Sequence, residues 1–301
     1  MRARAVNYAI NTLEELTIKG RVICASSNKY TVEVDGENLT INARGKIKYK
    51  SGEVLTGDFV EVENGAISKV YPRFSRFIRP NVANVDTLLI TISNPPKPDF
   101  LIVDKLLLSA NFANTECAIV INKCDLGAEI SDYVLNNYKF LPVFLVSAKT
   151  GEGIQALKSF ISGKTLAFAG QSAVGKTSIL NALMNTQFKT GEISEKSERG
   201  KHTTTGSRII RGDDFYLFDT PGFSEIIVDI SPQDAVMNYP PYDKYLNKCK
   251  YLDCTHLNEP DCHIKTLVEN GELSVDRYER YKLILEEIKK DYSNRYVSKK
   301  Y

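Results

Sequence analysis

A glycine-rich segment with the pattern G-x-x-x-x-G-K-T spans residues 170–177 and follows the apolar stretch Leu166–Ala169. In this pattern the glycines let backbone N–H groups turn inward around phosphates. Lys176 can supply positive charge to the β- and γ-phosphates, and Thr177 offers its hydroxyl to Mg²⁺. Because an expected strand precedes the segment and an expected helix follows it, the pattern predicts a phosphate-binding loop. The residues expected to contact the nucleotide are Gly170, Gln171, Ser172, Ala173, Val174, Gly175, Lys176, Thr177 and Ser178.

Two further motifs predict that the base of this nucleotide is guanine. Residues 122–125 have the form N-K-x-D, and residues 147–149 read S-A-K. The Asp125 carboxylate can accept hydrogen bonds from the N–H and NH₂ groups of guanine, an arrangement that adenine does not offer. Such a site rejects the wrong base by a factor of about 10⁴, since its acceptor would be left unpaired. The expected base-contacting residues are Asn122, Lys123, Asp125, Ser147, Ala148 and Lys149.

A third set of residues is expected to sense the γ-phosphate. Asp219-Thr220-Pro221-Gly222 fits D-x-x-G, in which Asp219 holds Mg²⁺ through water and the Gly222 amide meets the γ-phosphate. The polar run 190–206, which contains R-G-K-H-T-T-T, is typical of a mobile switch whose threonine ligates Mg²⁺.

Phe223 stands directly after this motif, where many switch GTPases place a glutamine that orients the attacking water. Phenylalanine cannot do so, and slow intrinsic hydrolysis is therefore expected. His202 is the nearest replacement in sequence, because an imidazole can position water or accept its proton. The alternative is that His202 only packs or hydrogen-bonds within the switch.

The order of these motifs is unusual, because residues 122–125 precede residues 170–177. In ordinary guanine-nucleotide switches the phosphate loop comes first. The reversed order indicates a circular permutation, which requires that the original termini lie close together.

A cysteine and histidine cluster of the form C-x₄-C-x-H-x₅-C follows, comprising Cys249, Cys254, His256 and Cys262. Three thiolates and an imidazole predict a closed, tetrahedral, structural zinc site. His263 is the competing ligand, but it adjoins Cys262 and would strain a shared tetrahedron.

Composition places the chain among soluble globular proteins. Its 301 residues predict two or more domains, 43% of them are hydrophobic and the net charge is +2. No apolar run approaches the ~18 residues of a membrane span, and no secretory signal is visible. We therefore expect a cytoplasmic protein without membrane association, a monomer, whose six cysteines serve as thiols or metal ligands.

The elements that must position these motifs fall into three regions. Residues 1–16 are weakly patterned. Five short strands follow, with Asp35-Gly36 and Asn64-Gly65 as hairpin turns, which predicts a small barrel, with the OB-fold as leading candidate. These strands are expected at Leu16–Ser26, Lys29–Val34, Asn38–Asn42, Asp58–Glu63 and Ala66–Val70. Residues 1–80 hold 13 Lys/Arg and 9 Asp/Glu. Lys46, Lys48 and Lys50 share one face of an extended chain, which predicts either a solvated edge or a surface for RNA phosphates.

Continuous apolar strands alternate with helices in the central region, which predicts a mostly parallel sheet covered on both faces. The strands are expected at Val85–Ser93, Cys117–Asn122, Leu141–Ser147, Thr165–Gly170, Ser207–Arg211 and Phe215–Asp219. The helices are expected near Asp99–Ala113, Gly153–Ser162 and Gly175–Met184. A last helix, capped by Ser274, carries an apolar stripe that we expect to pack on its own domain. The stripe comprises Tyr278, Tyr281, Leu285, Ile288 and Tyr292.

The permuted motifs, the preceding barrel and the following metal cluster together resemble the circularly permuted small-ribosomal-subunit biogenesis GTPases, the RsgA (YjeQ) family. The resemblance implies a bacterial cytoplasmic GTPase that uses Mg²⁺ and whose OB-fold and zinc domain contact ribosomal RNA. It further implies that the small subunit stimulates hydrolysis, that His202 is catalytic and that Thr204 is the switch threonine and Mg²⁺ ligand. Ala173 departs from the family, which usually has glycine there, and binding is expected to survive because alanine is small.

The resulting prediction is a multidomain chain. It has an OB-fold RNA-binding domain over residues 1–78, a circularly permuted P-loop GTPase over 79–228 and a mainly helical zinc domain over 229–301. Two alternatives remain: an RNA-binding protein whose nucleotide only orders the fold, and a phosphotransferase that uses the phosphate loop. We also expect the permutation to couple nucleotide state to the zinc domain, because the γ-phosphate motif leads directly into it.

Overall fold

The computed structural model describes residues 17–26, 29–44, 53–127, 129–184, 207–220, 223 and 228–297. The chain divides into two compact units. The first unit contains residues up to Asp86 together with 163–166 and 189–221. The second contains residues 87–162, 167–188 and 222 onward.

The first unit is built around a closed five-stranded barrel. Its strands are β1 (Ile18–Ser26), β2 (Lys29–Val34), β3 (Glu37–Ala43), β4 (Phe59–Glu63) and β5 (Ala66–Val70). Antiparallel pairs join β1 to β2, β2 to β3 and β4 to β5, a parallel pair joins β3 to β5, and β1 also pairs with β4. The ring therefore closes in the order 1-2-3-5-4, as predicted for an OB-fold. Alternating residues fill its interior, among them Val22, Val32, Val60 and Ile67.

Both predicted hairpin turns are present. Asp35 and Gly36 have φ values of 49° and 83°, and Asn64 and Gly65 have values of 52° and 69°. Two successive positive φ values are what a two-residue type I′ turn requires, and Asp-Gly and Asn-Gly are the pairs that adopt them most readily.

Two later strands belong to the same compact unit as the barrel. These are β12 (Arg208–Arg211) and β13 (Tyr216–Asp219), which pair with each other antiparallel, and β12 also meets β1 at Cys24. The short strands β6 (Arg76–Phe77) and β7 (Val82–Ala83) pair beside the barrel. Thr56 ties these parts together, because its Oγ1 donates to the Ser207 carbonyl at 3.0 Å and accepts from the Ala25 amide at 3.1 Å.

Parallel strands form the core of the second unit. β8 (Thr87–Ser93) pairs in parallel with β9 (Glu116–Asn122), and β9 pairs in parallel with β10 (Val143–Leu145). On its other side β8 neighbours β11 (Thr165–Ala169), of which residues 167–169 belong to this unit. All seven residues of β8 are buried, as expected for a central strand covered on both faces. The covering helices of this region are α3 (Phe100–Phe112), α4 (Ser131–Asn137), α5 (Ile154–Ile161) and α6 (Lys176–Met184). The sequence did not predict α4, and β10 is shorter than the expected strand Leu141–Ser147.

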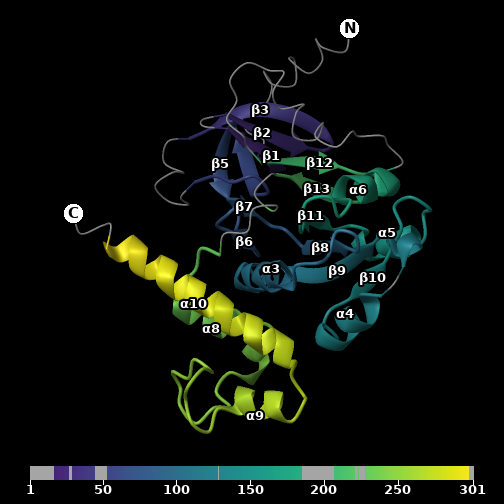
Figure 1. Ribbon diagram of the computed structural model, residues 1–301. Helices are drawn as coiled ribbons and strands as arrows, with labels where there is room; N and C mark the ends of the chain where they lie inside the picture. Colours follow the sequence, from purple (N-terminus) through teal and green to yellow (C-terminus); the bar gives the residue numbers. More distant parts are fainter. Residues whose placement is uncertain are drawn as a thin grey trace. The chain divides into compact units, whose positions relative to one another are not determined.

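Helices complete the second unit: α8 (Pro232–Asn238), the 3₁₀ turn η3 (Tyr242–Tyr245), α9 (His263–Glu269) and α10 (Val275–Val297). Ser274 caps α10 as predicted, since its Oγ accepts from the Arg277 amide at 3.2 Å. The apolar stripe of α10 packs within its own unit, with Tyr281, Leu285 and Ile288 buried against α8 and α9. α10, yellow in Figure 1, runs across α3 and α8. Among the described helices, none combines the length and the apolar character that crossing a bilayer demands.

A buried ionic group joins α3 to α10. Asp104 has a fully buried side chain and accepts from Arg277 Nε at 2.9 Å and from Arg280 Nε. Arg277 also donates to the Pro240 carbonyl, and its guanidinium lies over the rings of Tyr138 and Tyr239 at 4.9 and 5.3 Å. The Asp104 carboxylate therefore pairs with two guanidinium groups, and cation–π contacts with aromatic rings further stabilise their positive charge.

Asp104→Ala is expected to lower the free energy of unfolding by about 3–5 kcal/mol, because it leaves two guanidinium groups without their buried counterion. Chemical denaturation followed by circular dichroism measures this. Glu287→Ala is the matched control, since it removes the neighbouring ion pair of α3 and α10, Lys105–Glu287, whose carboxylate is 51% exposed. The control should cost at most about 1 kcal/mol. Equal losses in the two variants would contradict the role given to Asp104.

Candidate functional site

The predicted phosphate loop connects β11 to α6, as its sequence pattern required. Gly170 and Gly175 have φ values of 124° and 92°, which side chains rarely tolerate. A Cβ on Gly170 would lie 2.2 Å from the Thr91 carbonyl oxygen, and one on Gly175 would lie 2.3 Å from Asn122 Nδ2. Both glycines therefore allow the loop to press against β8 and the end of β9.

Lys176 lies inside this loop. Its Nζ donates to the carbonyl oxygens of Gly170 and Gln171, both at 2.7 Å. Burial lowers the pKa of Lys176, since the ammonium is removed from water. An anion placed in the loop would offset that cost, which makes this position suited to a phosphate. Thr177 is half-buried beside it at the start of α6, and Ser172 and Ser178 are exposed.

Asn122 joins the base-reading segment to the phosphate loop. Its side chain is buried, its Nδ2 donates to the Val174 carbonyl at 2.8 Å, and its Oδ1 accepts from the Ala148 amide at 3.1 Å. One amide side chain therefore holds the G-x-x-x-x-G-K-T and S-A-K segments in register. The N-K-x-D pattern predicted contact with the base, whereas this bridging role could be seen only in the structure.

Lys123 and Asp125 extend the same junction. Lys123 adopts a left-handed backbone with φ 64°, and its Nζ donates to the carbonyls of Ala173 at 2.9 Å and Pro95 at 2.7 Å. Asp125 is exposed, and its Oδ1 accepts from Ser147 Oγ at 2.6 Å. Ser147 thus restricts the orientation of the Asp125 carboxylate. Lys149 is exposed at the end of the same segment.

Gln171 connects the phosphate loop to α3. Its Oε1 accepts from the Asp99 amide at 2.8 Å, and Asp99 in turn caps α3 by accepting from the Leu101 amide at 2.9 Å. Asp99 was not predicted as part of the site. The only sequence signal was its helix-capping residue type ahead of an apolar run.

Ala173 has a φ of 63°, a left-handed conformation in which its Cβ crowds the following carbonyl oxygen. This conformation explains why glycine suits the position. Ala173→Gly is expected to stabilise the protein by about 1 kcal/mol. It is also expected to raise nucleotide affinity if the loop adopts this left-handed conformation only when the nucleotide binds. Thermal unfolding with and without GDP measures both effects.

The matched control is Ala156→Gly, the same replacement at an exposed position inside α5. It should destabilise by about 1 kcal/mol, since glycine there only adds chain entropy to the unfolded state. Destabilisation by both replacements would show that the loop carries no strain at Ala173.

Only some of the residues predicted to sense the γ-phosphate lie within the described part of the chain. Asp219, in the first compact unit, is held by Arg208, whose Nε lies 2.8 Å and Nη2 2.7 Å from Asp219 Oδ2. Burial raises the pKa of Asp219, and the hydrogen bond and charge of Arg208 oppose that rise. Phe223 is buried. His202, Thr204 and Gly222, like Lys46, Lys48 and Lys50, lie outside the described residues.

The four predicted metal ligands converge on one point. His256 Nδ1 lies 3.5 Å from Cys249 Sγ, 3.4 Å from Cys254 Sγ and 3.5 Å from Cys262 Sγ. Ligands around one Zn²⁺, with Zn–S of about 2.3 Å and Zn–N of about 2.0 Å, stand about 3.5–3.8 Å apart. The cluster therefore has the dimensions of a tetrahedral zinc site. His263 instead begins α9 and lies beside the Tyr245 ring.

Burial raises the pKa of the Cys254 thiol to about 12, so that a metal cation is needed to stabilise its thiolate. The loop itself is fixed by α10, since Tyr278 Oη donates to the His256 carbonyl at 2.7 Å and Tyr281 Oη to the Thr255 carbonyl at 2.6 Å. Glu259 adds a turn. Although burial would raise its pKa, hydrogen bonds from Thr255 and Leu257 lower the pKa to about 2.

Comparison with known proteins shows to which family this chain is similar. Residues 70–229 match the RsgA GTPase family. A small ribosomal subunit biogenesis GTPase RsgA from Thermotoga neapolitana is 35% identical over 90% of this chain and 96% of its own length. One from Alkaliphilus metalliredigens is 35% identical over 91% and 98%.

Solved structures agree. YjeQ from Thermotoga maritima superposes with a TM-score of 0.75 at 32% identity, covering 91% of this chain and 99% of its own. YloQ, described as a circularly permuted GTPase, gives a TM-score of 0.74 at 27% identity, covering 93% and 98%. The description of YloQ as circularly permuted agrees with the motif order of this chain, and the chain belongs to the RsgA GTPases.

Proposed function

We propose that this protein hydrolyses GTP to GDP and phosphate and acts in the maturation of the small ribosomal subunit. The observation that supports the proposal is the junction at Asn122, which joins the predicted phosphate loop to the predicted guanine-binding segment. Relatives across nearly the whole chain are named as small ribosomal subunit biogenesis GTPases, which supports the partner.

In this proposal the nucleotide is held from both ends. Asp125, oriented by Ser147, accepts from the guanine edge, while Lys176 and the loop amides hold the phosphates. Thr177, Thr204 and Asp219 would hold Mg²⁺, a hard cation suited to hydroxyl and carboxylate oxygens. Mg²⁺ would neutralise charge that develops on the phosphates. His202 would position the attacking water, since Phe223 cannot.

The cysteine-histidine cluster would hold one zinc ion. Four protein ligands complete a tetrahedron, so the ion would stabilise the fold and leave no position for substrate. We further propose that the barrel and the zinc region bind ribosomal RNA, that the three domains are residues 1–78, 79–228 and 229–301, and that the protein works in the cytoplasm as a monomer.

A hydrolysis assay tests the activity and the partner together. Release of phosphate from radiolabelled GTP would be measured with and without purified small ribosomal subunits, for the wild type and for His202→Ala. We expect subunits to accelerate release, and His202→Ala to lower the accelerated rate by about 10²–10⁴-fold. His263→Ala is the matched control, because that imidazole lies outside the metal cluster.

The outcomes separate the alternatives. Phosphate release that subunits do not accelerate would contradict the proposed partner. Acceleration that persists in His202→Ala would contradict the role of this histidine alone. Subunit binding that requires GTP but gives no turnover would favour a nucleotide-dependent RNA-binding protein.

A further inference from the structure

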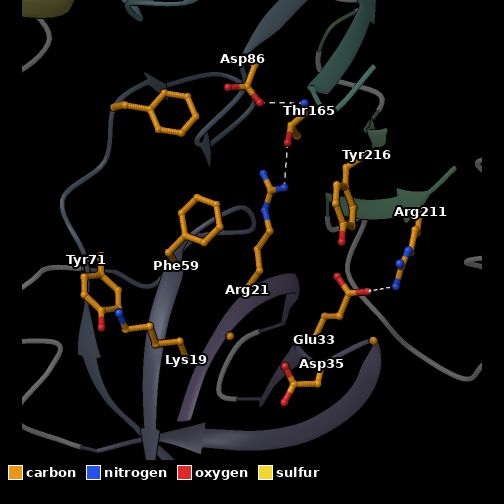
Figure 2. Close-up of a pocket in the computed structure, with 14 residues that line it drawn as sticks. Lys19, Arg21, Glu33, Asp35, Phe59, Tyr71, Asp86, Thr165, Arg211 and Tyr216 are labelled. Carbon is orange, nitrogen blue, oxygen red and sulfur yellow. Dashed lines mark hydrogen bonds and ion pairs between the residues drawn. The ribbon is translucent and has the colours of Figure 1, made fainter. Parts of the chain in front are cut away.

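A cavity of about 890 Å³ lies in the first compact unit, apart from the nucleotide and metal motifs. Strands β1 and β4 form one part of its wall, and residues 163–165 with β12 and β13 contribute another. Figure 2 shows its side chains converging from these separate segments. Its volume falls in the range of ligand pockets, which is about 300–1,000 Å³.

Arg21 forms part of the cavity wall. It is only 7% exposed, donates to Thr165 Oγ1 at 2.8 Å and to the Asn84 carbonyl at 3.0 Å, and its Nε has no hydrogen-bond partner among the described residues. The guanidinium lies 5.0 Å from the Phe59 ring centroid and 5.2 Å from that of Tyr216 (Figure 2). Because this Nε atom is itself buried, a ligand in the cavity does not reach it, and the guanidinium is held in the wall by its other contacts.

Aromatic surface is available in the same cavity. Phe59 and Phe74 are 41% and 45% exposed, although they are large hydrophobic side chains. Tyr71 lines the cavity beside them, with Lys19 Nζ 5.7 Å from its ring centroid. Exposed rings grouped around a hollow are suited to stacking against a flat ligand, as in proteins that bind unpaired nucleic-acid bases.

The charges of the lining narrow the ligand further. The cations Lys19, Arg21 and Arg211 are matched by Glu33, Asp35 and Asp86. Arg211 is paired with Glu33 at 3.2 Å. This balance disfavours a polyphosphate, which needs excess positive charge. It favours a neutral, planar ring that carries an N–H donor, because Asp86 offers a carboxylate.

We propose that this cavity binds a purine base, stacked on Phe59 and Phe74, with an amino group of the base donating to Asp86. The base could belong to a free nucleoside or to an unpaired position of an RNA strand. The proposal goes beyond the GTPase function, and only its RNA source rests on the proposed partner.

Fluorescence of 2-aminopurine, which stacking quenches, tests this directly. The full-length protein is first saturated with GDP and Mg²⁺ to occupy the guanine site. It is then titrated into 2-aminopurine riboside and, separately, into a uridine pentanucleotide that carries 2-aminopurine at its centre. We expect saturable quenching in at least one titration. The double variant Phe59→Ala, Phe74→Ala should bind that probe at least about tenfold more weakly.

Ile78→Ala is the control, since Ile78 is 45% exposed like Phe74 but does not line the cavity. Its affinity should be unchanged, and GDP affinity should be equal in all variants if they are folded. Quenching of the riboside that is insensitive to salt supports a free nucleoside, and quenching of the pentanucleotide alone, weakening with salt, supports RNA.

Absence of quenching in both titrations, or equal affinity in the double variant, would overturn the proposal. These readouts use no ribosomal subunits, so a failure of subunit-stimulated hydrolysis would leave them intact.

Discussion

Cys254→Ser is expected to remove the bound zinc and to unfold the region around the metal cluster. Metal binding stabilises small zinc sites by about 10 kcal/mol or more. The serine hydroxyl is a much poorer ligand than a thiolate, and the remaining ligands, His256 among them, cannot close a tetrahedron. Elemental analysis should give one zinc per wild-type chain and less in the variant, and thermal unfolding should begin at a lower temperature.

Cys124→Ser provides the control, because this thiol belongs to the N-K-x-D segment and is distant in sequence from the cluster. It should keep the metal and the unfolding temperature. A strong chelator should reproduce the effect of Cys254→Ser on the wild type. Retention of a full zinc equivalent in Cys254→Ser would contradict the proposed ligand set.

Asp125→Asn is expected to change the base preference from guanine to xanthine. In the proposed site the carboxylate would accept from the guanine N–H and NH₂ groups, whereas the asparagine amide can donate to the C2 carbonyl of xanthine. Removing a matched polar contact of this kind changes discrimination by about 10⁴. Calorimetric titration with GDP and with xanthosine diphosphate measures both affinities.

The same Cys124→Ser variant controls for disturbance of the segment and should bind GDP normally. Ser147→Ala should show a smaller loss of GDP affinity without a change of base preference, because it removes the 2.6 Å hydrogen bond that orients Asp125 but leaves its carboxylate. Unaltered preference in Asp125→Asn would place guanine recognition elsewhere.

Local patterns predicted much of the fold. Strands Lys29–Val34 and Ala66–Val70 have the predicted bounds, because each is bordered by a turn that only certain residues can form. The expected strand Leu141–Ser147 was too long. Its end leaves regular pairing to form the base-reading segment, in which the Cys124 amide donates to the Val146 carbonyl at 3.2 Å.

The sequence motifs also predicted the candidate site residues better than the long-range contacts that hold the surrounding helices together. The cluster at His256 and the loop at Lys176 follow from short, local spacing. The partnership of Asp104 with Arg277 spans 173 residues and has no local pattern. The one available signal was a carboxylate within an apolar helix, where a buried charge needs a partner.

Coupling between the nucleotide and the zinc region stays a prediction, and the second compact unit offers a route for it. Gln171 of the phosphate loop holds the start of α3 through Asp99, and Asp104 of the same helix holds α10. A change in the loop could thereby reach α10 without passing through the γ-phosphate motif that leads into the zinc region.

The position of α10 in the chain has a consequence for biosynthesis. Both of its partners, Asp104 and the loop that carries His256, are translated before it. Until α10 has been synthesised, the Asp104 carboxylate of α3 therefore lacks its guanidinium partners. The loop that carries His256 likewise lacks its hydrogen bonds from the tyrosines of α10. Since domains of growing chains generally fold in order of their synthesis, the barrel can mature early, whereas the nucleotide-binding unit completes its assembly only when residues 277–281 emerge.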